Sequence, residues 1–228
     1  MKNLLKALNV VYTTDIQSKF HDIAENLMYN YIIKKGESSY AIVEIEFYYH
    51  SPYHPDIITY PRNLRGGRWF FHQSGVDLTF DSESTILDKN GSVTNSKDAI
   101  FGGILIRGLY DIDTHVYTFG PQKCVNLLWQ DLGASSELDG YPTLERVPEG
   151  VIQRHIQEYR RCINIEQDKE IDKVKEWAKR VGKKVDDMLE SDLKKEFDKI
   201  INVKYRFFNL QNGENPTSFT KIPAKARP

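Results

Sequence analysis

The sequence predicts an α+β domain with a mixed, strongly curved, antiparallel-rich sheet flanked by helices. Segments with strand periodicity and segments with helix periodicity interleave along the chain. They do so without the regular strand–helix–strand alternation that produces a parallel sheet. The length of 228 residues favours a single domain over residues 1–228. Hydrophobic residues make up 40% of the chain, which is enough for a sizeable core.

The first predicted element is an N-terminal helix over about residues 14–35. Thr13, Thr14 and Asp15 are residue types that commonly cap helix N-termini, and Gly36 suits the position after the last turn. The apolar residues of this segment recur at helical spacing, as Ile16, Phe20, Ile23, Leu27 and Tyr31. They would form the buried stripe of the helix.

A strand follows over residues 40–49. Because successive side chains of a strand point to opposite faces, its apolar and its functional residues are expected to separate. The predicted apolar face consists of Ala41, Val43, Ile45 and Phe47. The opposite face carries Glu44, Glu46 and Tyr48. A carboxylate one repeat away from an aromatic ring can activate a water beside a base stacked on that ring. This pattern suggests cleavage of the bond between a base and its sugar.

The chain after this strand alternates between loops and short strands. Prolines at 52, 55 and 61 exclude regular structure and predict an exposed loop that reaches Gly66 and Gly67. A strand or hairpin is expected around Gly75, and a turn at Asn90-Gly91.

The second half of the chain contributes a buried strand, two helical segments and a last strand. Residues 101–110 form a mostly apolar strand with one arginine, and proline after Gly120 begins a helix. Residues 168–199 hold ten Lys plus Arg and ten Asp plus Glu around an apolar stripe at helical spacing. They predict a charged amphipathic helical insertion, at about 168–200, docked on the body with a solvated face. A partner-binding helix is the alternative interpretation. Residues 203–210 form the final strand.

Composition limits the partners and the compartment. The formal net charge is -1, so nucleic-acid affinity would have to come from a local basic patch. Cys124 and Cys162 lack C-x-x-C spacing, which suits a reducing compartment. No segment approaches the roughly 20 apolar residues that cross a membrane. We therefore expect a soluble, cytoplasmic monomer without membrane partners.

Six short motifs occur in the same order as in one known family. They are Val43-Glu44-Ile45-Glu46-Phe47-Tyr48, His54 seven residues before Pro61-Arg62-Asn63, Trp69-Phe70 with Gly75, Ile104-Leu105-Ile106-Arg107, Gly120-Pro121-Gln122-Lys123 and Tyr205-Arg206-Phe207-Phe208. In these motifs the chain resembles the methylpurine (alkyladenine, 3-methyladenine) DNA glycosylases. Phe47 stands where that family has a small residue, and the hairpin after Gly75 has fewer aromatic residues. The identity of the base therefore stays open.

The resemblance implies a glycosylase-like fold and a monofunctional DNA glycosylase that needs no cofactor. Its partner would be DNA containing a modified base, flipped out into a pocket. Glu46 would be catalytic, because cleavage of an N-glycosidic bond develops an oxocarbenium-like sugar that needs an anionic carboxylate nearby. Arg107, also catalytic, would help to hold the attacking water beside Glu46. Tyr48 would stack on the base and His54 would bind the sugar or phosphate. The residues expected to contact DNA phosphates are Arg62, Arg65, Arg68 and Lys123.

Plainer interpretations stay open beside these. Polar residues on one side of a strand are usually a solvated face, which would account for Glu44 and Glu46. Arg107 in an apolar strand also fits an ion pair with a buried carboxylate. Glu46, His50 and His54 have metal-ligand spacing, but intervening prolines exclude the helix that would align them, so no metal is predicted. The alternative function is a non-catalytic module that binds nucleic acid or protein.

Overall fold

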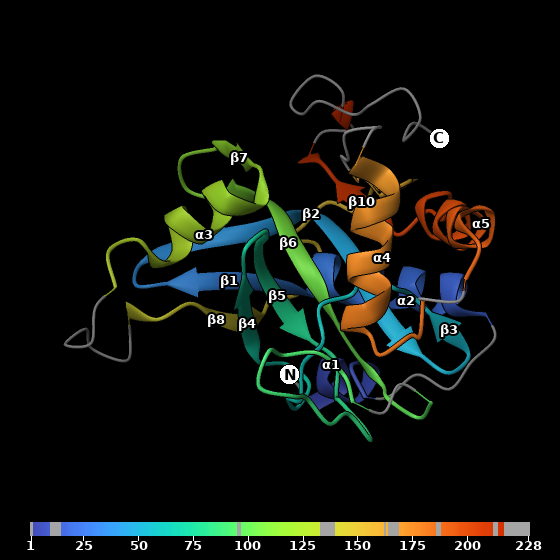
Figure 1. Cartoon of the computed structure of the whole chain (residues 1–228). Helices are drawn as coiled ribbons and strands as arrows, with labels where there is room; N and C mark the ends of the chain where they lie inside the picture. Colours follow the sequence, from blue (N-terminus) through green and yellow to red (C-terminus); the bar gives the residue numbers. More distant parts are fainter. Residues whose placement is uncertain are drawn as a thin grey trace.

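The fold is that of a computed structural model, which describes residues 2–9, 15–94, 97–132, 140–161, 163, 169–185, 188–211 and 214–216. Ten strands within these residues join in one strongly curled sheet, with helices packed around it (Figure 1). Every described strand pair is antiparallel, so the sheet is not mixed. The predicted α+β class with a curved, antiparallel-rich sheet is confirmed.

Two long strands form the centre of the sheet. They are β2 (Ser38–Ser51) and β6 (Phe101–Asp111), which pair along almost their whole length. The main path runs from β4 (Trp69–His72) through β5 (Gly75–Thr79), β6 and β2 to β1 (Tyr31–Lys35) and β8 (Thr143–Arg146). Off this path lie β3 (His54–Pro55), β7 (Tyr117–Phe119), β9 (Ile156–Tyr159) and β10 (Arg206–Asn209). The predicted strands at 40–49 and 101–110 and the hairpin at Gly75 are confirmed.

The helices are α1 (Lys2–Ala7), α2 (Ile16–Asn30), α3 (Pro121–Trp129), α4 (Glu170–Arg180) and α5 (Glu190–Ile201). As expected, α3 begins with proline after Gly120. None of the described helices is both long and apolar enough to cross a bilayer.

The N-terminal helix is shorter than predicted. Asp15 caps α2 by accepting a hydrogen bond from the backbone N–H of Ser18 at 3.1 Å, while Thr13 and Thr14 fall outside the described residues. The helix ends at Asn30, and residues 31–35 form β1 between β2 and β8. The run Tyr-Ile-Ile favours a strand, because aromatic and β-branched side chains fit a pleated surface. Gly36, with φ of 54°, is therefore the turn between β1 and β2 and not a helix cap.

The predicted faces of β2 are wrong in their first half. The pairing of β2 with β6 is irregular between Ile42 and Ile45, as it is at a β-bulge. Ala41 and Val43 consequently pack in a cluster with Phe208, whereas Ile45 and Phe47 pack in the main core. An irregularity of this kind exchanges the two faces of a strand, and alternation in the sequence does not reveal it.

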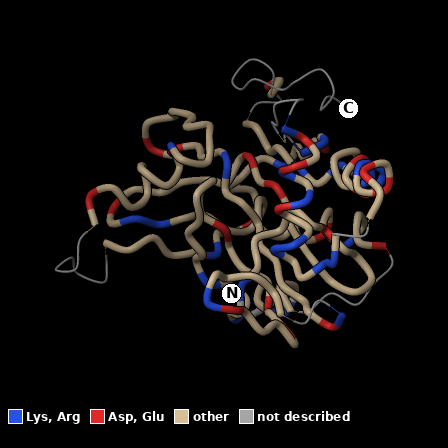
Figure 2. The backbone as a smooth tube through the Cα atoms, viewed as in Figure 1, with Lys and Arg blue, Asp and Glu red and all other residues tan. Residues whose placement is uncertain are grey.

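The charged segment is helical, as expected, but it forms two helices instead of one. α4 ends at Arg180, and Gly182 follows with φ of 80°, a conformation that stops helices. Acidic and basic residues mix along both helices (Figure 2). The apolar sides of α4 and α5 pack with Ile57, Ile58 and Phe101 in a second core cluster. The helical pair therefore covers one region of the sheet.

The loop after β2 is not exposed throughout. Its middle, residues 56–59 with Pro61 and Arg62, is buried, partly beneath α4 and α5. Asp56 anchors this segment through a fully buried ion pair with Arg161. Only the flanks of the loop, which include Arg65 and Arg68, lie at the surface.

Candidate functional site

Four neighbouring strands align three charged side chains and one leucine in a row across the sheet. In register, Asp77 of β5 lies beside Leu105 of β6, Leu105 beside Glu46 of β2, and Glu46 beside Arg206 of β10. Directly opposed residues of neighbouring strands lie on the same face and are in contact range. Arg107 of β6 and Tyr48 of β2 flank this row, two residues further along their strands from Leu105 and Glu46. This face of the sheet is the floor of the candidate site.

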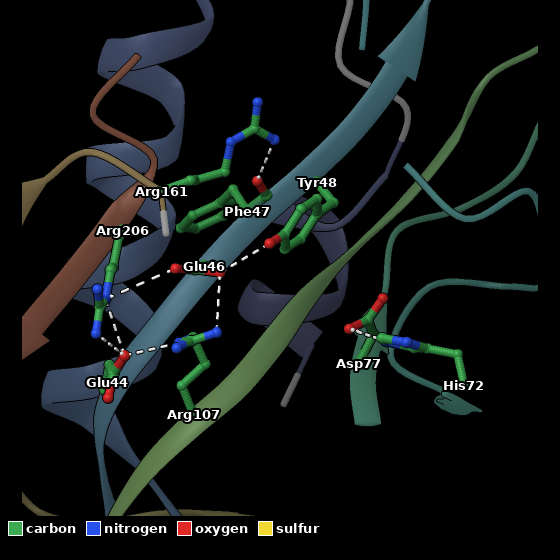
Figure 3. Close-up of polar contacts among 9 residues, drawn as sticks. All are labelled: Glu44, Glu46, Phe47, Tyr48, His72, Asp77, Arg107, Arg161 and Arg206. Atoms are coloured by element: carbon green, nitrogen blue, oxygen red, sulfur yellow. Dashed lines mark hydrogen bonds and ion pairs between the residues drawn. The ribbon is translucent and has the colours of Figure 1, made fainter. Parts of the chain in front are cut away.

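Glu46 lies at the centre of a dense polar network (Figure 3). Its side chain is 0% exposed. The Tyr48 hydroxyl donates to Glu46 Oε2 at 2.7 Å, and Arg107 Nη1 donates to the same oxygen at 3.2 Å. The other oxygen, Oε1, lies 3.6 Å from Arg206 Nε. Glu46 is thus held by one phenol and two guanidinium groups.

Glu44 binds the same two arginines. Its Oε1 accepts from Arg107 Nε at 2.7 Å and from Arg206 Nε at 2.9 Å, and Arg206 Nη2 lies 2.6 Å away. Glu44, Glu46, Arg107 and Arg206 form what we call the carboxylate–arginine cluster. Its two negative and two positive charges balance, which is the condition for burying ionised groups. Glu44 and Glu46 are therefore not the solvated face of a half-buried strand.

Burial and charge fix the protonation states at this site. Burial, together with the negative charge of Glu46, holds the pKa of Tyr48 well above its ordinary value, so the phenol stays a donor. Burial alone would lower the pKa of Arg107, but the charges of Glu46 and Glu44 more than offset it and raise that pKa. Arg107 therefore stays a cation.

A pocket of about 230 Å³ opens over this floor. Tyr48 and Arg107 line it, whereas Glu46 does not and lies behind their polar groups. The sequence predicted that these three residues would converge. Tyr48 and Arg107 each donate a hydrogen bond to Glu46, but the carboxylate itself does not line the pocket. Further lining residues are Ile58, Tyr60, Arg62, His72, Ser74, Asp77, Leu105, Ile163, Trp177 and Arg180.

Arg62 is not on a surface patch as expected. It is 2% exposed, and its Nη1 lies 2.6 Å from Asp77 Oδ2 in the pocket wall. His72 Nε2 lies 3.0 Å from the other oxygen of Asp77. Burial alone would raise the pKa of Asp77, but the charge of Arg62 and the hydrogen bond from His72 lower it. Asp77 is thus an ionised partner of Arg62.

The other predicted phosphate contacts are exposed but lie apart. Arg68 lines a different hollow, formed with α1 and β8, and Lys123 lies in the first turn of α3. Arg65 is exposed in the loop before β4. The predicted patch of three clustered arginines does not form, because Arg62 turns into the pocket.

His54 lies outside this pocket. It lines a separate hollow with Asp56, Tyr205 and residues of α5. Burial lowers its pKa. Arg161 lies between this hollow and the pocket. Its guanidinium is 5.0 Å from the centre of the Tyr48 ring and 5.3 Å from the centre of the Tyr205 ring. His54 is therefore not placed to bind a nucleotide that stacks on Tyr48.

The sequence reasoning missed several residues of the site. Arg206 completes the carboxylate–arginine cluster, Asp77 pairs with Arg62, and Trp177 and Arg180 line the pocket from α4. A signal for Arg206 was present, because a charged residue inside an apolar strand requires a buried counter-charge. The contribution of α4 had no comparable signal.

No protein-family model, curated protein or solved structure matches this chain. Among the residues that the structure describes, no group of three or more His, Cys, Asp and Glu side chains could hold a metal ion.

Proposed function

We propose that this chain is a monofunctional DNA glycosylase. It would hydrolyse the N-glycosidic bond of a modified, alkylated base flipped out of DNA and leave an abasic site. One observation carries the proposal: Glu46 is hydrogen-bonded to both Tyr48 and Arg107, and these two residues line a pocket of about 230 Å³. A carboxylate, an aromatic ring and a cation at one pocket wall are the groups that this reaction uses.

In the proposed reaction the flipped base stacks on the Tyr48 ring, and stacking of this kind contributes ~1–3 kcal/mol per base. The bond between C1′ and the base nitrogen breaks, and its electron pair leaves with the base. A water held by Arg107 and Glu46 attacks C1′ and gives its proton to Glu46. The anionic carboxylate also balances the positive charge that develops on the sugar.

Access to the carboxylate requires one local movement. Tyr48 Oη and Arg107 Nη1 both donate hydrogen bonds to Glu46 Oε2. A water can bind this oxygen only when one of these two donors moves aside. The Tyr48 side chain lines the pocket, so an incoming base would contact it first. Substrate entry would then expose the catalytic oxygen. Arg65, Arg68 and Lys123 are exposed cations and stay candidates for phosphate contacts.

A second candidate is a non-catalytic module that binds a base or nucleotide in the same pocket. The observation that favours it is the complete enclosure of Glu46, which is 0% exposed and held by three side chains. In that case the carboxylate–arginine cluster would only support the pocket wall.

Base release from defined oligonucleotides separates these two functions. Oligonucleotides that carry alkylated purines, hypoxanthine or bulky modified pyrimidines are incubated with excess protein, and abasic sites are cleaved with alkali. For a substrate that is released, Glu46→Gln should slow single-turnover release by about 10²–10⁴-fold, the range for a positioned acid–base group. Glu37→Gln, at an exposed turn residue, is the matched control and should keep the wild-type rate.

The outcome is decisive for Glu46 in either direction. Wild-type-like release by a folded Glu46→Gln variant would falsify the proposed role. Tight binding of a modified oligonucleotide without any release would favour the non-catalytic module.

A further inference from the structure

The helix α4 forms the roof of the pocket. Trp177 and Arg180 of α4 line it together with Ile58 and Tyr60 from the buried part of the loop after β2. In Figure 1, α4 crosses in front of β2 and β6, whose residues form the floor. The charged helical segment therefore takes part in the pocket itself, in addition to its packing role.

Arg180 brings a further positive charge into this pocket, and no carboxylate among the described lining residues pairs with it. Its guanidinium lies 4.1 Å from the centre of the Tyr60 ring and donates from Nη2 to the carbonyl of Ile58 at 3.2 Å. Within the described part of the chain, Arg180 forms no ion pair, and its buried Nε has no hydrogen-bond partner. The Ile58 carbonyl and the Tyr60 side chain orient this cation, and its charge is offset only in part by the exposed Glu176, which pairs with Lys173.

Arg62 also lines the pocket, with one donor nitrogen unused. It is 2% exposed, and its Nε donates to the carbonyl of Tyr60 at 3.0 Å. The central carbon of its guanidinium group lies 4.1 Å from the centre of the Phe70 ring. Nη1 lies 2.6 Å from Asp77 Oδ2 in their ion pair, whereas the buried Nη2 has no hydrogen-bond partner among the described residues. A buried guanidinium that lines a cavity with free donors indicates a ligand acceptor.

The charges around the pocket do not balance. Arg107 is balanced within the carboxylate–arginine cluster, and Arg62 is balanced by Asp77. Arg180 remains as one excess positive charge among the described lining residues. Burial lowers the pKa of Arg180 and also that of Arg62, and a bound anion would offset this cost.

We infer that the pocket recognises an oxyanion on the base through Arg180 and Arg62. The ligand class is a nucleoside whose base carries a carboxylate or a similar acidic substituent. Planar guanidinium groups bind such oxygens in pairs, and the surrounding rings of Tyr48, Tyr60 and Trp177 offer faces for the base.

The register of the sheet places this subsite next to Tyr48. Gly103 is the β6 residue opposite Tyr48. A side chain at Gly103 would collide with Arg62 and with Asp77, so the guanidinium of Arg62 lies over this glycine. The backbone of Gly103 lies one strand spacing, roughly 4.8 Å, from that of Tyr48, so Arg62 borders the place where a base would stack on Tyr48. Its substituent can reach the subsite while its sugar faces Arg107.

Binding of matched free nucleosides tests this inference. The probes are 5-carboxy-2′-deoxyuridine, its neutral analogue 5-carbamoyl-2′-deoxyuridine and unsubstituted 2′-deoxyuridine 5′-monophosphate, titrated calorimetrically into the full chain. The carboxylate should bind at least about tenfold more tightly than the carboxamide, which corresponds to about 1.4 kcal/mol. Arg180→Met should abolish this preference and Arg180→Lys should keep part of it.

The matched control is Lys179→Met, which removes the same charge from an exposed neighbour on α4 and should keep the full preference. Equal or absent binding of carboxylate and carboxamide by the wild type overturns the inference. So does a preference confined to the 5′-monophosphate, which would place the oxyanion on the sugar side. The inference rests on the proposed function only for the choice of a nucleoside. Since the readout is binding, its failure is distinct from a failure of base release.

Discussion

The carboxylate–arginine cluster predicts a large and specific loss of stability in the variant Arg206→Met. Arg206 is fully buried and contacts Glu44 at 2.6 Å and 2.9 Å and Glu46 at 3.6 Å. Methionine keeps much of the apolar stem but removes one of the two guanidinium groups that contact the two buried carboxylates. Removing one partner of a buried ion pair costs about 3–5 kcal/mol, because the remaining charge is not compensated. We expect a loss of this size in the free energy of unfolding.

The charge balance of the cluster also predicts that a second substitution recovers part of the lost free energy of unfolding. In the double variant Arg206→Met with Glu44→Gln, one carboxylate faces one guanidinium and the cluster is neutral again. The double variant should therefore lose at least about 2 kcal/mol less than the sum of the two single losses, within the range of coupling between contacting residues.

Urea unfolding followed by circular dichroism measures these free energies by linear extrapolation. Arg154→Met is the matched control, because Arg154 is 48% exposed and pairs with exposed Glu149. A surface pair of this kind contributes about 0–1 kcal/mol. A loss in Arg206→Met no greater than in the control, or strict additivity in the double variant, would refute the charge balance inferred for the cluster.

Two further predictions concern the surroundings of the site. Burial lowers the pKa of His50 below its ordinary 6.5, so the folded state binds fewer protons and stability falls as pH drops below that value. His50→Asn should reduce this slope by up to about 1.4 kcal/mol per pH unit in urea titrations, and an unchanged slope would contradict the assignment. In Gly103→Ala the new Cβ would lie 2.7 Å from Asp77 Cβ, which should cost about 1–3 kcal/mol and weaken the preference for the carboxylated nucleoside. Gly140→Ala, whose Cβ would meet its nearest neighbour at 3.4 Å, should change neither quantity.

Much of the sheet could be predicted from local pattern. β6 is long and apolar, and the β4–β5 hairpin has a glycine at its turn, so periodicity and turn chemistry sufficed for both. The extent of α2 could not be predicted in this way. Tyr31, Ile32 and Ile33 continue its apolar pattern, and only their pairing with β2 and β8 makes them a strand. Gly182 did carry a usable signal, since glycine at this point commonly ends a helix.

The site was predictable only in its centre. Glu46 and Tyr48 lie on β2 and Arg107 lies on β6, and the antiparallel pairing of these two long strands brings the three residues together. Arg62 could not be placed, because its position depends on the burial of the preceding loop beneath α4 and α5. Trp177 and Arg180 come from a segment whose composition is that of an ordinary solvated helix. Their place in the pocket follows from tertiary packing alone.

Two glycines of β6, Gly103 and Gly108, leave room for charged side chains of the site. A Cβ at Gly108 would lie 2.7 Å from Glu44 Cβ, and a Cβ at Gly103 would displace Arg62 and Asp77. Three charged side chains of the site, Glu44, Arg62 and Asp77, thus occupy space that these two glycines leave free. An ordinary apolar strand would gain packing from side chains at both positions. The strand instead carries glycine on either side of Leu105 and Arg107, which admits the buried charges on both flanks. This arrangement is costly for a sheet with a structural role alone, and the proposed site would account for it, because that site uses a buried carboxylate on one flank and a guanidinium on the other.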